Sequence, residues 1–347
     1  MRIGFDVTEL AGPPGGVRTA IRLVLEALRK DEPDLDIVAL APRDVPVPVG
    51  VRMKATGGPV KPRAWRESYA LREATEQIDL FHSPVLAHPD LEHVPVTVTL
   101  HELPFVVNAR LEGNRRALAQ WRWLNRVMAR CAAMVVPSQA TLEQLRMVHP
   151  GAVRMTRVIP HPAPNVEEMQ HDHDGSLLFV GRLDRRKSIE ALLEGCAQCE
   201  GLVRLAGPQD PKRRTYLEKI VQRNGMQERV EFLGEVDSKM LAYLYRNAGA
   251  VALVSRSEGF GFPVLEALGR GVPVIVAEGT GAAEVGGRAA IAVNPRRKDQ
   301  IADAWKRSLE TEHRAFVRTH GPAELLRFRP KDVARAYKRL WTDALAR

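Results

Sequence analysis

The segment VALVSRSEGFGFPVLEALGRGVPVIVAE, residues 251–278, decides the fold class of this chain. It opens and closes with short apolar runs, which predict two strands. Between the runs stand Gly259 and Gly261, followed by Pro263, a residue well suited to the first turn of a helix. The segment therefore predicts a strand, a loop, a helix and a second strand, which is the repeating unit of a parallel sheet.

The same alternation of apolar runs and helix-period segments extends along the whole chain. The expected strands are 3–7, 37–40, 78–81, 94–100, 133–136, 157–159, 177–180, 203–206, 230–233, 250–254, 273–276 and 291–293. Helices fit between them, for example at 188–199, 211–224 and 238–248. This pattern predicts an α/β protein with parallel sheets that helices cover on both faces.

The best candidate for a domain boundary is HPAPNVEEMQHDHD at 161–174, which is polar and lacks periodicity. We expect two Rossmann-like, doubly wound domains, 1–165 and 166–325, facing each other across a cleft. Residues 326–347 contain an apolar helical stripe that no strand follows, so this helix must pack on a part that is already folded.

Composition excludes several classes of protein. The 347 residues are 45% hydrophobic and 27% charged, which is typical of a globular chain. The longest stretch without charge is about 12 residues, against roughly 18 for a membrane-spanning helix. Three cysteines make no disulfide framework, so a reducing cytoplasm is expected. The net charge of +9 favours polyanionic partners, whether nucleic acid, acidic lipid or nucleotide phosphates, without choosing among them.

Ligands of open parallel sheets bind beyond the carboxyl ends of the strands, so the residues there are candidates for a site. Gly15 and Gly16 follow the first strand, where they allow close approach to an anion or simply form a tight turn. His101 follows the strand at 94–100, as a group of the site or as a structural histidine. Residues 182–187, which precede a predicted helix, contain four Arg and Lys side chains. These cations suit the binding of a diphosphate; the alternative is a solvated basic turn.

The most specific pattern joins Glu258 to Glu266 across the glycine-containing loop at 259–262. Glu258 precedes the predicted helix and Glu266 lies about one turn inside it. Such a pair of carboxylates suits sugar hydroxyls on either side of a phosphate held by backbone amides. The alternative is that Glu266 only complements the helix dipole.

In these motifs the chain resembles the retaining glycosyltransferases of family 4, which have the GT-B fold and use nucleotide-sugar donors. The E-x7-E motif at 258–266 and the G-R-L…K element at 181–187 match that family. FHSP at 81–84, HELPF at 101–105 and FLGEV at 232–236 match further elements in the expected order. The resemblance is greatest to bacterial mannosyltransferase-like enzymes that build polysaccharides, and it implies that the last helix crosses back to the N-terminal domain.

The resemblance assigns roles to individual residues. Arg182 and Lys187 would hold the donor diphosphate, and Glu266 the ribose. Glu258 would bind the sugar, next to Gly259, Phe260, Gly261 and Phe262, whose amides would meet the phosphates. His101 would lie near the transferred sugar as an active-site residue, and Gly15 and Gly16 beside the β-phosphate. No metal and no cofactor beyond the nucleoside-diphosphate sugar is implied. Ser188 departs from the family, in which glycine or asparagine is common.

Basic residues alternate with tryptophan in 61–66 and 110–130, within the half of the chain that receives acceptors in this family. This composition fits an anionic membrane surface, so the acceptor could be a sugar or a lipid-linked sugar at the inner face of the plasma membrane. It also fits the binding of single-stranded nucleic acid. A third interpretation fits as well, in which the tryptophans are buried in the core and the arginines are solvated. Two other functions remain open: a non-catalytic nucleotide-binding scaffold and a nucleic-acid-binding protein, although no nucleic-acid-binding signature is apparent.

Overall fold

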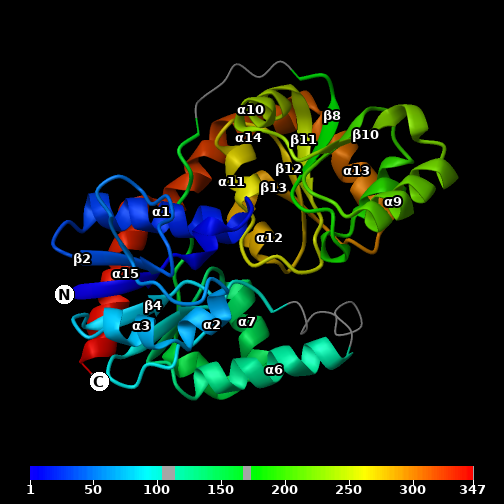
Figure 1. The fold of residues 1–347 in the computed structure, drawn as a ribbon. Helices are drawn as coiled ribbons and strands as arrows, with labels where there is room; N and C mark the ends of the chain where they lie inside the picture. Colours follow the sequence, from blue (N-terminus) through cyan, green and yellow to red (C-terminus); the bar gives the residue numbers. More distant parts are fainter. Residues whose placement is uncertain (104–113, 167–172, 347) are drawn as a thin grey trace. The chain divides into compact units, whose positions relative to one another are not determined.

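The computed structural model describes residues 1–103, 114–166 and 173–346 (Figure 1). Within it the chain divides into two compact units. Unit 1 comprises Met1–Ala163 together with Phe328–Arg347, and unit 2 comprises Pro164–Arg327. Some residues of the predicted motifs lie outside the described ranges, namely Pro104 and Phe105 of HELPF and Arg110 of the basic segment. The middle of the predicted domain boundary, 167–172, also lies outside them.

Unit 1 contains a seven-stranded sheet in the order β3-β2-β1-β4-β5-β6-β7, in which all pairs of neighbouring strands are parallel. The strands are β1 (Arg2–Asp6), β2 (Asp36–Ala41), β3 (Arg52–Ala55), β4 (Leu80–Ser83), β5 (Val96–Thr99), β6 (Ala133–Val136) and β7 (Thr156–Val158). The helices are α1 (Gly16–Asp31), α2 (Pro62–Arg66), α3 (Tyr69–Ala74), α6 (Asn114–Met128), α7 (Gln139–Val148) and α15 (Pro330–Leu345).

Unit 2 contains a six-stranded parallel sheet in the order β10-β9-β8-β11-β12-β13. Its strands are β8 (Ser176–Val180), β9 (Val203–Ala206), β10 (Val230–Gly234), β11 (Ala248–Leu253), β12 (Val274–Ala277) and β13 (Ala290–Val293). Its helices are α8 (Ile189–Cys196), α9 (Pro211–Arg223), α10 (Ser238–Asn247), α11 (Phe262–Leu268), α12 (Gly281–Gly286), α13 (Lys298–Ser308) and α14 (Thr311–Glu324). The expected doubly wound α/β architecture is confirmed in each unit.

The core of unit 1 forms one hydrophobic cluster on each face of its sheet. Successive side chains of a strand point to opposite faces, so Ala39 belongs to one cluster while Val38 and Leu40 belong to the other. The first cluster includes α1 and α15, and the second includes Leu71, Leu124 and Leu145 from α3, α6 and α7.

The C-terminal helix α15 belongs to unit 1, as expected from its apolar stripe. It packs against α1, although more than 300 residues separate Lys338 from its ion-pair partner Glu32 (Figure 1). Val333, Tyr337 and Trp341 are all buried there.

Capping residues mark where several helices begin. The side chain of Asp210 accepts a hydrogen bond from the Arg213 N–H at the start of α9, and Asp237 accepts one from the Met240 N–H at the start of α10. Each cap satisfies one of the backbone donors that the first turn of a helix leaves without an intrahelical partner.

Candidate functional site

The strand order of unit 2 places the predicted donor-binding segments next to each other. From β8 the chain winds through β9 and β10 to one edge, and β11 to β13 extend to the other edge, so the winding direction reverses between β8 and β11. Such a reversal opens a crevice at the carboxyl ends of the strands. The segment after β8 carries Arg182 and Lys187, and the segment after β11 carries Glu258 and the glycine loop.

Direct contacts join these two segments. The Lys187 Nζ atom lies 2.5 Å from Glu258 Oε2, and the two side chains are only 13% and 15% exposed. The Arg256 N–H also donates a 2.9 Å hydrogen bond to the Arg186 carbonyl. The structure therefore brings together Lys187 and Glu258, which lie 71 positions apart in the sequence.

Arg182 differs from Lys187 in its surroundings. Its side chain is exposed, and no hydrogen bond or ion pair holds it within the part of the chain that the structure describes. A guanidinium in this state can turn toward a bound anion without first breaking another contact.

The loop that precedes α11 depends on its glycines. Gly261 has φ +101°, a conformation that side-chain-bearing residues rarely adopt, and it leads directly into Phe262 and Pro263. A Cβ added at Gly281 would lie 2.2 Å from the Gly259 carbonyl oxygen, so α12 packs closely against the loop. The rings of Phe260 and Phe262 are buried and meet edge to face.

Ser188 is the only residue other than glycine with positive φ in the described ranges, at 52°. This explains why glycine or asparagine is common there in the family, because both tolerate the left-handed region. The Ser188 hydroxyl is buried, as is that of Ser257 in the neighbouring segment, and neither has a protein hydrogen-bond partner among the described residues.

Glu266 lies within α11 and receives a hydrogen bond that no pattern in the sequence indicates. The Tyr245 hydroxyl of α10 donates to Glu266 Oε2 over 2.6 Å. Twenty-one positions separate the two residues, and no motif links them.

In unit 1, His101 is fixed by two hydrogen bonds beyond the end of β5. Its Nε2 lies 2.7 Å from the Pro84 carbonyl oxygen, and its Nδ1 lies 3.2 Å from His161 Nε2. Since a carbonyl only accepts, Nε2 of His101 carries a proton. Burial lowers the pKa of both histidines, which favours the neutral pair.

Gly15 precedes α1, and Gly16 is the first residue of that helix. Gly15 has extended backbone, and a Cβ added to it would meet nothing within 4 Å. Packing inside unit 1 therefore does not require glycine at this position.

An ion-pair network fixes the segment that leads to Gly15, and it corrects one expectation. Arg66 belongs to the segment 61–66, whose composition fits a membrane surface, but its side chain is only 10% exposed. Its Nε donates to Asp6 Oδ2 over 2.7 Å, and its Nη2 donates to Thr8 Oγ1 over 2.9 Å. Trp65 beside it is fully buried, with its indole N–H bonded to Thr56. Both residues therefore serve the core of unit 1.

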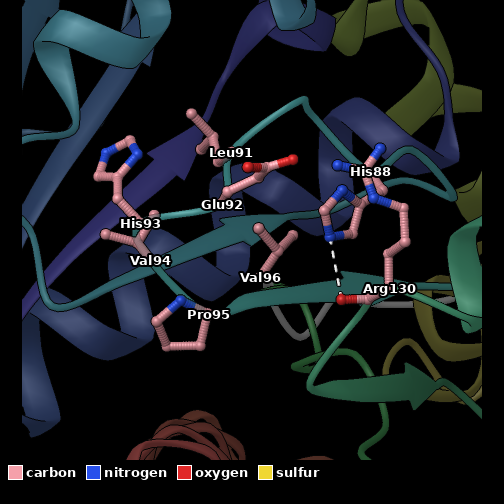
Figure 2. Close-up of a pocket in the computed structure, with 8 residues that line it drawn as sticks. All are labelled: His88, Leu91, Glu92, His93, Val94, Pro95, Val96 and Arg130. Carbon is pink, nitrogen blue, oxygen red and sulfur yellow. Dashed lines mark hydrogen bonds between the residues drawn. The ribbon is translucent and has the colours of Figure 1, made fainter.

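A separate pocket of about 420 Å³ lies at the opposite end of β5 (Figure 2). It is lined by His88, Leu91, Glu92, His93, Val94, Pro95, Val96 and Arg130. The Nε2 atom of His88 lies 3.2 Å from the Arg130 carbonyl oxygen. Neither His101 nor its partners Pro84 and His161 line this pocket, so it is distinct from the group of residues around His101.

Within the described ranges, no helix is both long and apolar enough to cross a membrane. In the same ranges, no group of three or more His, Cys, Asp and Glu side chains is placed to hold a metal ion.

Two doubly wound units, with cations and carboxylates at the reversal point of unit 2, define the GT-B class of glycosyltransferases. A model of glycosyltransferase family 4 matches residues 14–163, and a model of glycosyl transferases group 1 matches 167–319. The chain belongs to glycosyltransferase family 4.

Individual proteins agree with this assignment. O-antigen chain mannosyltransferase B of Escherichia coli is 29% identical over 171 residues, which cover 48% of this chain and 45% of the relative. D-inositol 3-phosphate glycosyltransferase of Corynebacterium jeikeium is 25% identical over 285 residues, which cover 73% of this chain and 68% of that protein. The chain thus spans less than half the length of the first of these relatives.

Solved structures share the fold over nearly the whole chain. Sucrose-phosphate synthase from Thermosynechococcus elongatus superimposes with a TM-score of 0.80 at 22% identity and covers 99% of both chains. Anabaena HepE in complex with UDP-glucose has a TM-score of 0.78 at 17% identity, with 99% of this chain and 100% of HepE covered.

Proposed function

We propose that this protein is a retaining glycosyltransferase that moves a hexose from a nucleoside-diphosphate sugar to an acceptor hydroxyl. The observation that carries the proposal is the Lys187–Glu258 pair at the reversal point of unit 2, with the exposed Arg182 in the same segment after β8 as Lys187. A cation next to a carboxylate suits a ligand that has a phosphate adjoining a sugar, because each group then meets its complement.

On this proposal, Arg182 and Lys187 neutralise the diphosphate as it leaves, in place of a divalent metal. Glu258 binds the sugar, and Glu266 binds the ribose hydroxyls. The loop formed by Gly259, Phe260, Gly261 and Phe262 lies against the phosphates. These groups orient the donor and stabilise developing charge, which are the main ways a protein accelerates such a transfer.

The reaction itself exchanges one bond at the anomeric carbon for another. The bond from that carbon to the phosphate oxygen breaks, and a bond to the acceptor oxygen forms on the same face. The acceptor proton passes to the departing phosphate oxygen. The proposal assigns His101, which Pro84 and His161 hold, to the transferred sugar, and Gly15 and Gly16 to the β-phosphate; a Cβ added at Gly15 would meet nothing within 4 Å.

The transferred sugar is proposed to be mannose, for cell-surface polysaccharide or glycolipid synthesis in the cytoplasm. Similarity to the E. coli O-antigen mannosyltransferase supports this choice. The structural relationship to HepE, solved with UDP-glucose, supports a nucleotide sugar as donor.

A thermal-shift screen of UDP- and GDP-sugars tests the donor class. A ligand at 100 times its Kd adds about 2.7 kcal/mol to stability, so the true donor should raise Tm clearly. Lys187→Ala should lose that shift, whereas Lys219→Ala, on an exposed position of α9, should keep it. Stabilisation by none of the nucleotide sugars would contradict the proposal.

The proposed acceptor is lipid-linked, and an exposed basic face of unit 1 supports contact with an anionic membrane. This face comprises Lys61, Arg63, Leu118, Trp121, Arg122 and Arg126. Leu118 and Trp121 lie on α6, where they are 47% and 43% exposed. The Arg63 guanidinium of α2 lies 5.6 Å from the centroid of the Trp123 ring of α6, and this contact joins the two helices. Each cation near such a surface contributes about 1 kcal/mol, so binding should weaken with salt.

Liposome flotation tests the membrane contact. Replacing Arg63, Arg122 and Arg126 with Glu should abolish flotation with anionic vesicles and spare donor binding. The matched control replaces Arg29, Lys30 and Arg339, exposed residues of α1 and α15 on the other side of the sheet, and should still float. Equal recovery with neutral and anionic vesicles, or recovery with neither, would favour a soluble acceptor.

The two other functions give different results. A non-catalytic scaffold would bind the nucleotide sugar without turning it over. A nucleic-acid-binding protein would bind oligonucleotides with a steep salt dependence and would ignore nucleotide sugars.

A further inference from the structure

The Tyr245 side chain lies in an enclosed environment between two charged groups. It is 1% exposed, and its hydroxyl donates the 2.6 Å hydrogen bond to Glu266 Oε2. The guanidinium of Arg270 lies 5.0 Å from the centroid of the Tyr245 ring. Arg270 Nη1 also donates to the Glu266 backbone carbonyl over 2.8 Å. Tyr245 and Arg270 thus hold the side chain and the backbone of the same glutamate.

The chemistry of the two partners sets the direction of the hydrogen bond. An ionised carboxylate only accepts, so the phenol must donate. Burial, and next to it the charge of Glu266, raise the pKa of Tyr245 well above its usual value, which keeps the hydroxyl protonated. The hydroxyl is therefore protonated, and able to donate, at neutral pH.

This arrangement leaves one carboxylate oxygen available. Oε2 receives the Tyr245 hydroxyl, while Oε1 accepts no hydrogen bond from any residue that the structure describes. A glutamate side chain rotates freely unless another group fixes it, and fixing it in advance lowers the entropic cost of binding. A carboxylate anchored by one oxygen offers the other in a defined direction.

We infer that Tyr245 is a positioning residue for donor binding, which anchors Oε2 of Glu266 so that Oε1 meets the ribose hydroxyls of the nucleotide. The inference rests on the proposed function, because it takes the ribose as the partner of Glu266. It adds a residue of α10 to the proposed donor-binding groups of unit 2, which otherwise come from the segment after β8, the glycine loop after β11 and α11. Tyr245 itself does not touch the donor.

The experiment compares two nucleotides that differ only in the hydroxyls concerned. Calorimetry measures the Kd of UDP or GDP, whichever base the thermal-shift screen selects, and of its 2′,3′-dideoxy analogue. Tyr245→Phe keeps the ring and its contact with Arg270 and removes only the donor. It should weaken binding of the ribonucleotide by up to about tenfold, because Glu266 must then be immobilised when the donor binds, and leave the dideoxy analogue unchanged within about twofold.

Tyr243→Phe is the matched control, since Tyr243 lies on the same helix and is 56% exposed. It should change neither Kd. A second measurement uses the Glu266→Ala background, in which Tyr245→Phe should have no further effect on the ribonucleotide. That non-additivity is the signature of one residue acting through another.

The outcomes separate the inference from the proposed function. Equal weakening of both nucleotides by Tyr245→Phe would show a structural role and overturn the inference, and so would no weakening of either. If the wild-type protein binds ribonucleotide and dideoxy analogue equally, and Glu266→Gln changes neither, then Glu266 does not bind ribose and that part of the proposed function fails. Wild-type discrimination that Tyr245→Phe preserves would overturn the inference alone.

Discussion

Among single residues, Lys187 and Glu258 link the segments after β8 and β11 by an ion pair. Each side chain is largely buried, and each has the other as an ionic partner 2.5 Å away. Removing a charge from water is costly unless a partner compensates it, so the pair can be held at the end of the sheet without a bound anion. A diphosphate that enters beside Arg182 would then meet two cations.

The first prediction concerns these cations. Arg182→Ala and Lys187→Ala should each reduce transfer by about 10²-fold or more, because each removes charge stabilisation of the leaving group. Steady-state rates with the identified donor measure this effect. Lys219→Ala on α9 should retain the wild-type rate, and near-normal turnover in either site variant would remove that residue from the mechanism.

Buried histidines of unit 1 lead to a prediction about pH. His82 on β4 is completely buried, with its ring nitrogens near the hydroxyls of Thr97 and Thr99. Burial lowers its pKa to about 3, whereas an unfolded histidine titrates near 6.5. Below pH 6.5 the unfolded chain binds a proton that the folded chain does not, so stability should fall as the pH falls.

One such histidine should lower the free energy of unfolding by about 1.4 kcal/mol between pH 7.5 and 5.5. Urea denaturation measures the free energy of unfolding at the two pH values. The change in this free energy between pH 7.5 and 5.5 should be about 1.4 kcal/mol smaller in His82→Gln than in the wild type. His320→Gln, at an exposed position of α14, should leave it as in the wild type. An unchanged pH dependence in His82→Gln would mean that His82 is not kept neutral by the fold.

At the scale of elements, α15 is the segment whose role depends most on contacts distant in sequence. Its stripe of apolar residues predicts that the helix packs on another folded part of the chain. In the structure α15 packs on α1 and on the face of the unit 1 sheet that α1 also covers. Trp341 is fully buried, with its ring 5.4 Å from that of Tyr337 and 5.6 Å from that of His82.

Trp341→Ala should therefore destabilise unit 1 by about 3–5 kcal/mol, the usual cost of emptying a buried aromatic site. Chemical denaturation of the full chain measures the loss. Leu345→Ala, at a position on the same helix that is 39% exposed, should cost less than about 1 kcal/mol. Comparable losses in both variants would contradict the specific role of the Trp341 contact.

The elements differ in how well the sequence predicts them. The strand β6 (AMVV) is a continuous apolar run, and in β9 (VRLA) only Arg204 interrupts the apolar residues; the predicted bounds of both strands are confirmed to the residue. The strand β3 was missed because its sequence RMKA has no apolar pattern, since it lies at the edge of the sheet with mostly exposed side chains. An apolar pattern in the sequence indicates a strand only where its side chains are buried, and the side chains of β3 are mostly exposed.

For the molecule as a whole, the two doubly wound parallel sheets could be predicted from the sequence, while the pairing of side chains could not. Alternation of strands and helices predicts parallel sheets, and their winding brings the segments after β8 and β11 together. Whether Arg66 faces solvent or Asp6 depends on packing between residues sixty positions apart, which periodicity does not record. The Tyr245–Glu266 bond was missed for the same reason.

The motifs themselves could be found in the sequence because their chemistry is local. One loop and the helix after it hold Glu258, the glycines that follow it and Glu266. Their spacing can therefore be recognised in the sequence without knowledge of the fold. His161 has no such pattern, and only the structure shows it bonded to His101.

Release of nucleoside diphosphate from a nucleotide sugar is the direct test of whether this protein transfers sugars. The purified chain is incubated with UDP- and GDP-sugars, with water or an added sugar as acceptor, and the freed diphosphate is measured over time. We expect release from one donor, at a rate that Lys187→Ala lowers by about 10²-fold while Lys219→Ala does not change it. Binding of a nucleotide sugar without any release would contradict catalysis, and neither binding nor release of any donor would contradict the assignment of the site itself.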